Sequence, residues 1–362
     1  TDWIFFLTHG NQFRARLDQL GFTLGNDTIK GTFGFDNNTS YGGVYGSLFS
    51  TADGMYYDFK PSISMGLGYT SSLISVGVGY NVTLGPRLPK QNGKTEEKLV
   101  QQAAHTPVLV LNALDNAFRM AIPIQVYAFN DKTPDGIKTS INLVSVDSQF
   151  RYYTGLDMLP QIRLYLRYGG GNYKVGAESE KIGESFGFDF RLYFGSMVEE
   201  VALQPYVRLT YDGALGKYHT QTRIEAVSVF TTGNFNVPNN LQLAKSAWNL
   251  NLVAGLGLTA NSDIVSLYLE PTLGLKVNQA GSIDKNAKEI YSLGYGVYAE
   301  IYITPLKNLE WYFEAQLGNL GGSGTYTTTD GAGATTTTTV SLTKLGLGFN
   351  ATTGITWYLP AL

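Results

Sequence analysis

The chain has 362 residues, no cysteine and a formal net charge of −3. Aromatic residues make up 13% of it, which excludes an intrinsically disordered chain, and the lack of cysteine excludes a disulfide scaffold and a thiolate metal site. No run approaches the roughly 20 apolar residues of a membrane-spanning helix, and the slightly acidic balance argues against a general nucleic-acid binder.

Alternation of apolar and polar residues is the dominant pattern along the whole chain. In one segment, Met120 and Ile122 share one face and Arg119 lies on the other. Successive side chains of a strand point to opposite faces, so each such segment predicts a strand with one apolar and one polar face. In residues 1–50 and 106–116 the register is ambiguous. Elsewhere the pattern predicts strands at residues 57–67, 74–82, 118–127, 161–168, 186–194, 201–211, 248–258, 265–273, 291–303, 311–317 and 345–357.

The length and the apolar face of these strands are typical of a membrane protein. The strands run to about 9–14 residues, where a tilted membrane strand needs about 9–11 and a globular strand averages about 5–6. The apolar face is almost free of charge and the polar face carries arginine and glutamate, so one face suits lipid and the other water. A soluble sandwich, propeller or solenoid would also alternate. However, no repeat of fixed period supports a propeller or solenoid, and a sandwich needs more charge on its outer faces.

The connections between the strands alternate between short turns and long polar loops. Short turns are expected at residues 25–27, 70–72, 260–263 and 305–308. Long loops are expected at residues 86–105, with a short helix at 95–104, and at 169–183, 213–245 and 276–288. The Gly- and Thr-rich tract at 321–339 has low complexity and is expected to be mobile. Short turns on one rim and long loops on the other predict an all-β fold, a single antiparallel transmembrane β-barrel of about 14 strands (range about 12–16), which forms one domain over residues 1–362.

Charged residues of the polar face predict a site inside the barrel. The basic group lies in the middle of the chain and consists of Arg119, Arg163, Arg167, Arg191 and Arg208. The acidic group follows it and consists of Glu270, Glu300, Glu310 and Glu314. Strands that follow each other in sequence are neighbours in a barrel wall, so we expect the two groups to line different arcs of the lumen. Opposed charge in a narrow lumen would select polar solutes, which makes these residues candidate pore-lining residues. In the alternative interpretation, the charges pair across strands and fill the lumen.

Catalytic, cofactor and metal motifs are absent from the sequence. The histidines His9, His105 and His219 have no second metal ligand at helical spacing, and neither a nucleophile elbow nor a phosphate-binding loop occurs. The glycine clusters at 169–171 and 321–324 are expected to be loop glycines. We therefore expect no enzyme, no cofactor and no metal site. A hydrolase at one rim, with a serine, an acid and a histidine (His105 or His219) in loops, is the remaining enzymatic alternative.

The first residues of the chain carry a family resemblance. Residues 2–4 read DWI, residues 6–22 read FLTHGNQFRARLDQLGF and residues 24–35 read LGNDTIKGTFGF. This stretch resembles the mature N-terminus of the variable surface proteins of Brachyspira spirochaetes, and the mass of 39.5 kDa is similar too. The resemblance implies an abundant, antigenic outer-membrane protein that is made with a signal peptide and assembles as a multimer. It implies no catalytic residue, and it does not by itself imply a pore.

Two functions are compatible with these observations. In the first, the chain is an abundant outer-membrane surface protein, a porin-like passive channel for small polar solutes that also acts as a surface antigen. In the second, a closed or plugged barrel acts only through its loops as a variable surface antigen or adhesin, with no transport role. The expected partners are outer-membrane lipid, further copies of the chain, and a host surface or antibody at the loops, but not nucleic acid. The expected location is the cell outer membrane.

Overall fold

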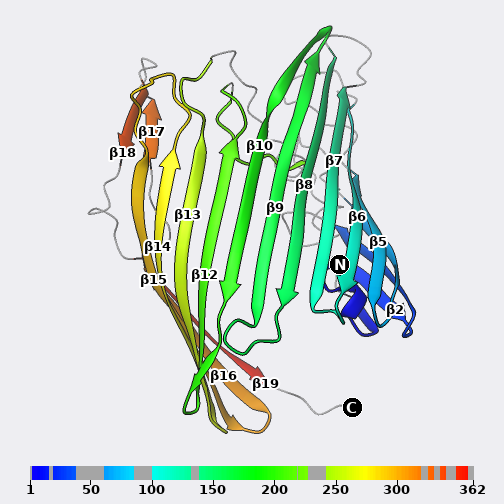
Figure 1. Cartoon of the computed structure of the whole chain (residues 1–362), viewed down its shortest axis with the longest axis vertical. Coiled ribbons are helices and arrows are strands. Elements are labelled where there is room, and N and C mark those ends of the chain that lie inside the picture. Colours follow the sequence, from blue (N-terminus) through cyan, green and yellow to red (C-terminus); the bar gives the residue numbers. More distant parts are fainter. Residues whose placement is uncertain are drawn as a thin grey trace, which may run out of the picture.

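The protein is built almost entirely from antiparallel strands (Figure 1). The computed structural model describes residues 2–15, 19–37, 61–84, 100–131, 138–217, 219–226, 242–318, 325–329, 335–339 and 348–357. A 3-10 turn, η1 (Phe6–Thr8), precedes the strands. Within the described ranges, no helix is both long enough and apolar enough to cross a membrane. The strands are β1 (Gln12–Ala15), β2 (Gln19–Gly25), β3 (Ile29–Asn37), β4 (Pro61–Tyr69), β5 (Ile74–Leu84), β6 (Val100–Ala113), β7 (Phe118–Asp131), β8 (Thr139–Tyr153), β9 (Gln161–Val175), β10 (Glu178–Tyr193), β11 (Ser196–Val198), β12 (Val201–Ala214), β13 (Trp248–Asn261), β14 (Val265–Gln279), β15 (Ile290–Leu306), β16 (Leu309–Gly318), β17 (Thr325–Thr329), β18 (Thr335–Thr339) and β19 (Gly348–Trp357).

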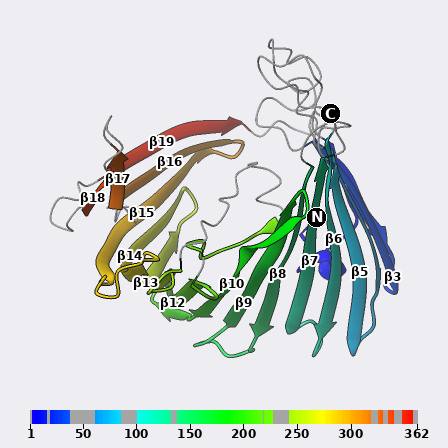
Figure 2. The ribbon, with the colours of Figure 1, turned by 90° about the horizontal axis from the view of Figure 1, so that it is seen from above.

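One large curved sheet contains most of these strands, and each strand pairs with the next. The sheet has 17 strands, and β11 continues the line of β10 along β12, so sixteen strands stand side by side in the described part of the chain. β16 pairs with β19, whereas β17 and β18 form a separate hairpin. Figure 2 shows the curvature, with β19 at one end of the sheet and β3 near the other. The described registers do not join these two ends.

The predicted all-β antiparallel fold is therefore confirmed, while closure into a barrel stays a prediction. The sheet is sixteen strands wide, which is more than the expected number of about 14 and at the upper end of the expected range. The strands β1, β2 and β3 all fall within residues 1–50, where the alternation was ambiguous.

The two faces of the sheet differ as the alternation predicts. On the outer face, Leu252 and Leu293 are each 45% exposed and Leu273 is 56% exposed. Leu252 pairs with Leu275, which pairs with Leu293, so these side chains form a continuous apolar row. The concave inner face carries Arg, Asp, Ser and Thr side chains. Soluble monomers rarely expose contiguous apolar patches of this kind, so the outer face needs an apolar partner.

Most connection lengths follow the prediction, with short turns on one rim and long loops on the other, but the two-residue turn between β9 and β10 lies at the long-loop rim. Strand bounds leave only residues 26–28, 70–73 and 307–308 between strands at the lower rim of Figure 1. At the opposite rim, residues 38–60 and 215–247 separate consecutive strands of the sheet.

Two predictions about the connections are wrong. Residues 169–183 are not a loop, because β9 continues to Val175 and β10 begins at Glu178. The expected helix at 95–104 is not formed in its described part, because residues 100–104 belong to β6. Residues 95–99 and the glycine cluster 321–324 lie outside the described residues, as do residues 57–60 of the first predicted strand and residues 345–347 of the last. The tract at 321–339 contains the β17–β18 hairpin.

Candidate functional site on the inner face

Five arginines form one continuous row across the inner face of the sheet. The registers pair Arg119 with Arg151, Arg151 with Arg163, Arg163 with Arg191, and Arg191 with Arg208. This arginine row crosses β7, β8, β9, β10 and β12, and it begins near the short-turn rim, because Arg119 is the second residue of β7. Directly opposite side chains have Cβ atoms about 4.5–5.5 Å apart, and like charges at that spacing destabilise a sheet. The row therefore carries an electrostatic cost.

A buried carboxylate neutralises part of the row. Asp189 is 1% exposed and lies between Arg191 and Arg208, with 2.8 and 2.6 Å from its Oδ2 to their Nη2 atoms. Arg167 is not in the row: it lies four residues farther along β9 than Arg163 and pairs with Asp212 at 3.0 Å. Three of the five predicted arginines thus pair with acids, and two of them, Arg167 and Arg208, do so across strands.

The three remaining arginines of the row, Arg119, Arg151 and Arg163, contact aromatic rings. The Cζ atoms of Arg119 and Arg151 lie 5.3 and 4.7 Å from the ring centre of Phe5. The Cζ atom of Arg163 lies 4.7 Å from the ring centre of Tyr193. Among the described residues, none of these three arginines forms an ion pair with a carboxylate. This end of the row is therefore cationic.

The predicted acids lie on β14, β15 and β16, away from the row. Tyrosine hydroxyls donate hydrogen bonds to Glu270 and Glu300, including that of Tyr206 at 2.9 Å from Glu270. Glu300 is directly opposite Glu314, and Glu310 lies four residues from Glu314 on β16. Within the described ranges, no ion pair joins these acids to the arginine row. The basic and acidic groups therefore occupy different strands of one sheet, and their pore-lining role stays a prediction.

The N-terminal segment (residues 3–8) packs on the inner face of β4 and β5. Glycines leave that face bare: a Cβ atom at Gly79 would lie 2.3 Å from the ring of Trp3, and one at Gly68 would lie 2.4 Å from Leu7. Lys30 Nζ donates to the backbone oxygen of Leu7 at 3.0 Å. The surface on which this segment packs thus requires glycine. Phe5 of the segment contacts the arginine row.

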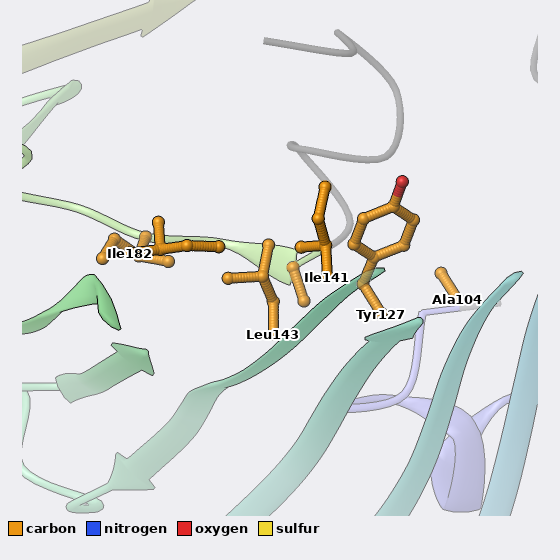
Figure 3. Close-up of a cluster of buried hydrophobic side chains, with 7 residues drawn as sticks. Ala104, Tyr127, Ile141, Leu143 and Ile182 are labelled. Atoms are coloured by element: carbon orange, nitrogen blue, oxygen red, sulfur yellow. The ribbon is translucent and has the colours of Figure 1, made fainter. Parts of the chain in front are cut away.

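A second segment, residues 219–226, lies across the inner face of β8, β9 and β10, and we name it the strap. The backbone N–H groups of Ile224 and Ala226 each donate to a serine Oγ at 2.9 Å, on Ser185 and Ser145 respectively. Both strap residues belong to a buried apolar cluster with side chains of β6, β7, β8 and β10 (Figure 3). A Cβ atom at Gly169 would lie 1.9 Å from the backbone oxygen of Ile224. Gly169 was expected to be a loop glycine, and it is instead a strand glycine that makes room for the strap.

Polar contacts also fix the strap. Arg223 lies 3.6 Å from Asp147 of β8 and pairs with Glu225 within the strap. The Nε2 atom of His219 accepts a hydrogen bond from the backbone N–H of Glu184 at 3.0 Å. Burial lowers the pKa of His219 below its ordinary value, so the neutral imidazole is favoured in the folded protein.

The two histidines of the hydrolase alternative lie in different elements. His105 belongs to β6 rather than to a loop, and its Nδ1 atom hydrogen-bonds with the hydroxyl of Tyr80. His219 belongs to the strap. Among the described residues, no group of three histidines, aspartates or glutamates is placed to hold a metal ion.

Comparison of the sequence with protein-family models identifies the family of the chain. A family model described as Serpulina hyodysenteriae variable surface protein matches residues 1–358. The chain belongs to this family. The match extends the resemblance of the first residues over nearly the whole sequence and confirms it. No curated protein matches the chain.

Family membership makes this chain a variable surface protein, which supports exposure at the cell surface and a surface antigen role. Its inner face combines the arginine row, the N-terminal segment and the strap. Of these features, sequence analysis found four of the five arginines of the row. It missed Arg151, because β8 alternates weakly around Val146, Ser148 and Gln149.

Proposed function

We propose that this variable surface protein is an outer-membrane β-barrel that passively conducts small polar solutes and exposes its long loops as antigen. The observation that carries the proposal is the division of the sheet into two faces. The outer face exposes rows of leucine. The inner face holds charged and hydroxyl side chains, and its apolar side chains are covered by the N-terminal segment and the strap. A strand wall with lipid outside and water inside requires this division.

The physics of lipid supports closure of the sheet into a barrel. In the hydrocarbon region every backbone N–H and C=O group must find a partner within the protein, and an open sheet edge leaves such groups unpaired. Nine strands of the wall, β6–β10 and β12–β15, have 14 to 17 residues, which is more than the about 9–11 that a tilted strand needs to cross. Barrels of about 16–18 strands leave an aqueous channel.

Single-channel recording in a planar bilayer tests the proposal. The purified full-length protein, shown to be folded by its heat-dependent electrophoretic mobility, is added to one side of the bilayer. We expect stable conductance steps from the folded sample and none from the same sample after heat unfolding. The absence of conductance from folded, inserted protein would refute the channel.

A second candidate function has its own supporting observation. The N-terminal segment and the strap both lie on the inner face, where they take up space that a pore would use. In this alternative the barrel is plugged and acts only through its long loops, as an antigen or adhesin. Folded protein without conductance that still binds antibodies raised against the intact protein would favour this function.

A further inference from the structure

The unpaired end of the arginine row is a destabilising arrangement unless something else balances it. Arg119, Arg151 and Arg163 stand on three consecutive strands and face one another in register. Neighbouring strands lie about 4.8 Å apart, so the three positions span about 10 Å. Asp189, the acid beside the row, is already shared by Arg191 and Arg208. Three positive charges are therefore concentrated, and none of them forms an ion pair with a carboxylate of the described residues.

Hydrogen-bond donors also remain open at this end of the row. The Nε atoms of Arg151 and Arg163 are buried and have no hydrogen-bond partner within the described residues. Arg163 Nη2 donates to Gln161 at 2.9 Å. Arg119 donates from Nη1 to Thr8 Oγ1 at 3.3 Å and from Nε to the backbone oxygen of Asn116 at 3.1 Å. A guanidinium has five N–H donors, and these hydrogen bonds use one donor of Arg163 and two of Arg119. The two buried Nε atoms are closed to a dissolved ligand, so a ligand would bind the remaining Nη donors.

Cation–π contacts with aromatic rings hold the guanidinium groups without using those donors. Phe5 contacts Arg119 and Arg151, and Tyr193 contacts Arg163. A cation–π contact attracts the positive charge to the face of the ring and uses no N–H group as a hydrogen-bond donor to an oxygen. The rings therefore hold the cations and leave their donors for oxygen acceptors. Planar, oriented guanidinium edges match the paired oxygens of carboxylate and phosphate.

We propose that Arg119, Arg151 and Arg163 form a binding site for a small dissolved oxyanion, a carboxylate or a phosphate. The inference rests on the proposed channel, because it names the solute class that the channel would favour. A divalent anion, such as phosphate or a short dicarboxylate, balances the excess charge best. Its oxygens accept hydrogen bonds from the guanidinium groups of the three side chains.

Thermal unfolding in lipid-free alkyl maltoside micelles tests the binding. The full-length protein is titrated with inorganic phosphate or succinate, and KCl at equal ionic strength is the reference. A ligand that binds only the folded state raises the unfolding temperature in proportion to the logarithm of its concentration above Kd. We expect both oxyanions to raise it beyond KCl, and Arg163→Gln to weaken the apparent affinity about tenfold or more.

Lys276→Gln is the matched control, because Lys276 stands on β14 outside the row and loses the same charge. It should keep the affinity of the unaltered protein. Equal stabilisation by KCl, or equal loss in both variants, would overturn the proposal. So would stabilisation that phosphatidylglycerol produces and phosphate does not, since it would assign the row to a lipid headgroup. If Arg163→Gln does not fold, the comparison of oxyanions with KCl on the unaltered protein decides alone.

The outcome is separable from that of the channel. Folded protein that binds phosphate but does not conduct keeps the anion site and refutes the channel. Protein that conducts but gains no stability from phosphate or succinate refutes the anion site only.

Discussion

An arginine placed on the outer face should cost far more stability than one placed on the inner face of the same strand. Leu252→Arg puts the charge on the exposed apolar row, and Asn251→Arg puts it one residue away on the inner face. β13 has 14 residues, and tilted by about 45° it is about 34 Å tall. Leu252 lies between two and three residues from the strand centre, which places it about 6 Å from the midplane. The cost of arginine is about 2–4 kcal/mol at the midplane and falls toward the interfaces, so we expect about 2 kcal/mol.

Asn251→Arg provides the matched control. The new side chain would stand directly opposite Lys276 on β14, and a like-charge pair at that spacing costs about 0.2–1 kcal/mol. Urea titrations of both variants, folded into phospholipid vesicles, give the two free energies of unfolding. An equal loss of unfolding free energy in the two variants, or a larger loss in Asn251→Arg, would show that the assigned faces are wrong.

Three further predictions concern the inner face. Asp189→Asn removes the carboxylate shared by two arginines of the row, so we expect the free energy of unfolding in urea titrations to fall by about 3 kcal/mol. A fall below about 1 kcal/mol would show that the pairing is not needed for stability. Gly169→Ala places a Cβ atom 1.9 Å from the backbone oxygen of Ile224, so hydrogen exchange at the strap amides should speed up while strand amides stay protected. Acid should loosen the strap, because burial lowers the pKa of His219. The stability that the neutral imidazole contributes is complete above the ordinary pKa of 6.5 and is lost as the pH falls below that value. Protonation of Nε2 also breaks the hydrogen bond from Glu184. Protection factors of the strap amides, taken relative to the intrinsic exchange rate at each pH, that stay constant between pH 7 and about 5 would contradict this assignment.

The alternation of side chains predicted the faces of the sheet, because a period of two is a local property of the chain. Leu252 and Asn251 need no knowledge of their neighbours to be assigned to opposite faces. The arginine row could not be predicted in this way, because a row depends on the register between strands, and the turns set the register. Arg167 shows the difference: the sequence groups it with the other arginines, but the register places it outside the row, beside Asp212.

The glycines at 169–171 show a second limit. A run of glycine in a polar stretch is typical of a loop, and the sequence predicted one there. The structure uses Gly169 inside a strand, because a segment more than 50 residues later in the chain packs against that position. Gly79 serves the N-terminal segment in the same way. The absence of a side chain is visible in the sequence, but the partner that requires the absence is not.

The strap and the arginine row lie at different depths of the inner face. Gly169, Ser145 and Ser185 contact the strap, and each lies six residues along its strand from an arginine of the row. Six residues correspond to about 20 Å along the strand, toward the rim of long loops. A solute that enters from that rim would therefore pass the strap before it reaches the row. Because the two features share no residue, Gly169→Ala should change conductance through the strap and leave the affinity for phosphate unchanged. In the proposed channel, the physical obstruction and the choice of anion would therefore be carried by separate parts of one wall.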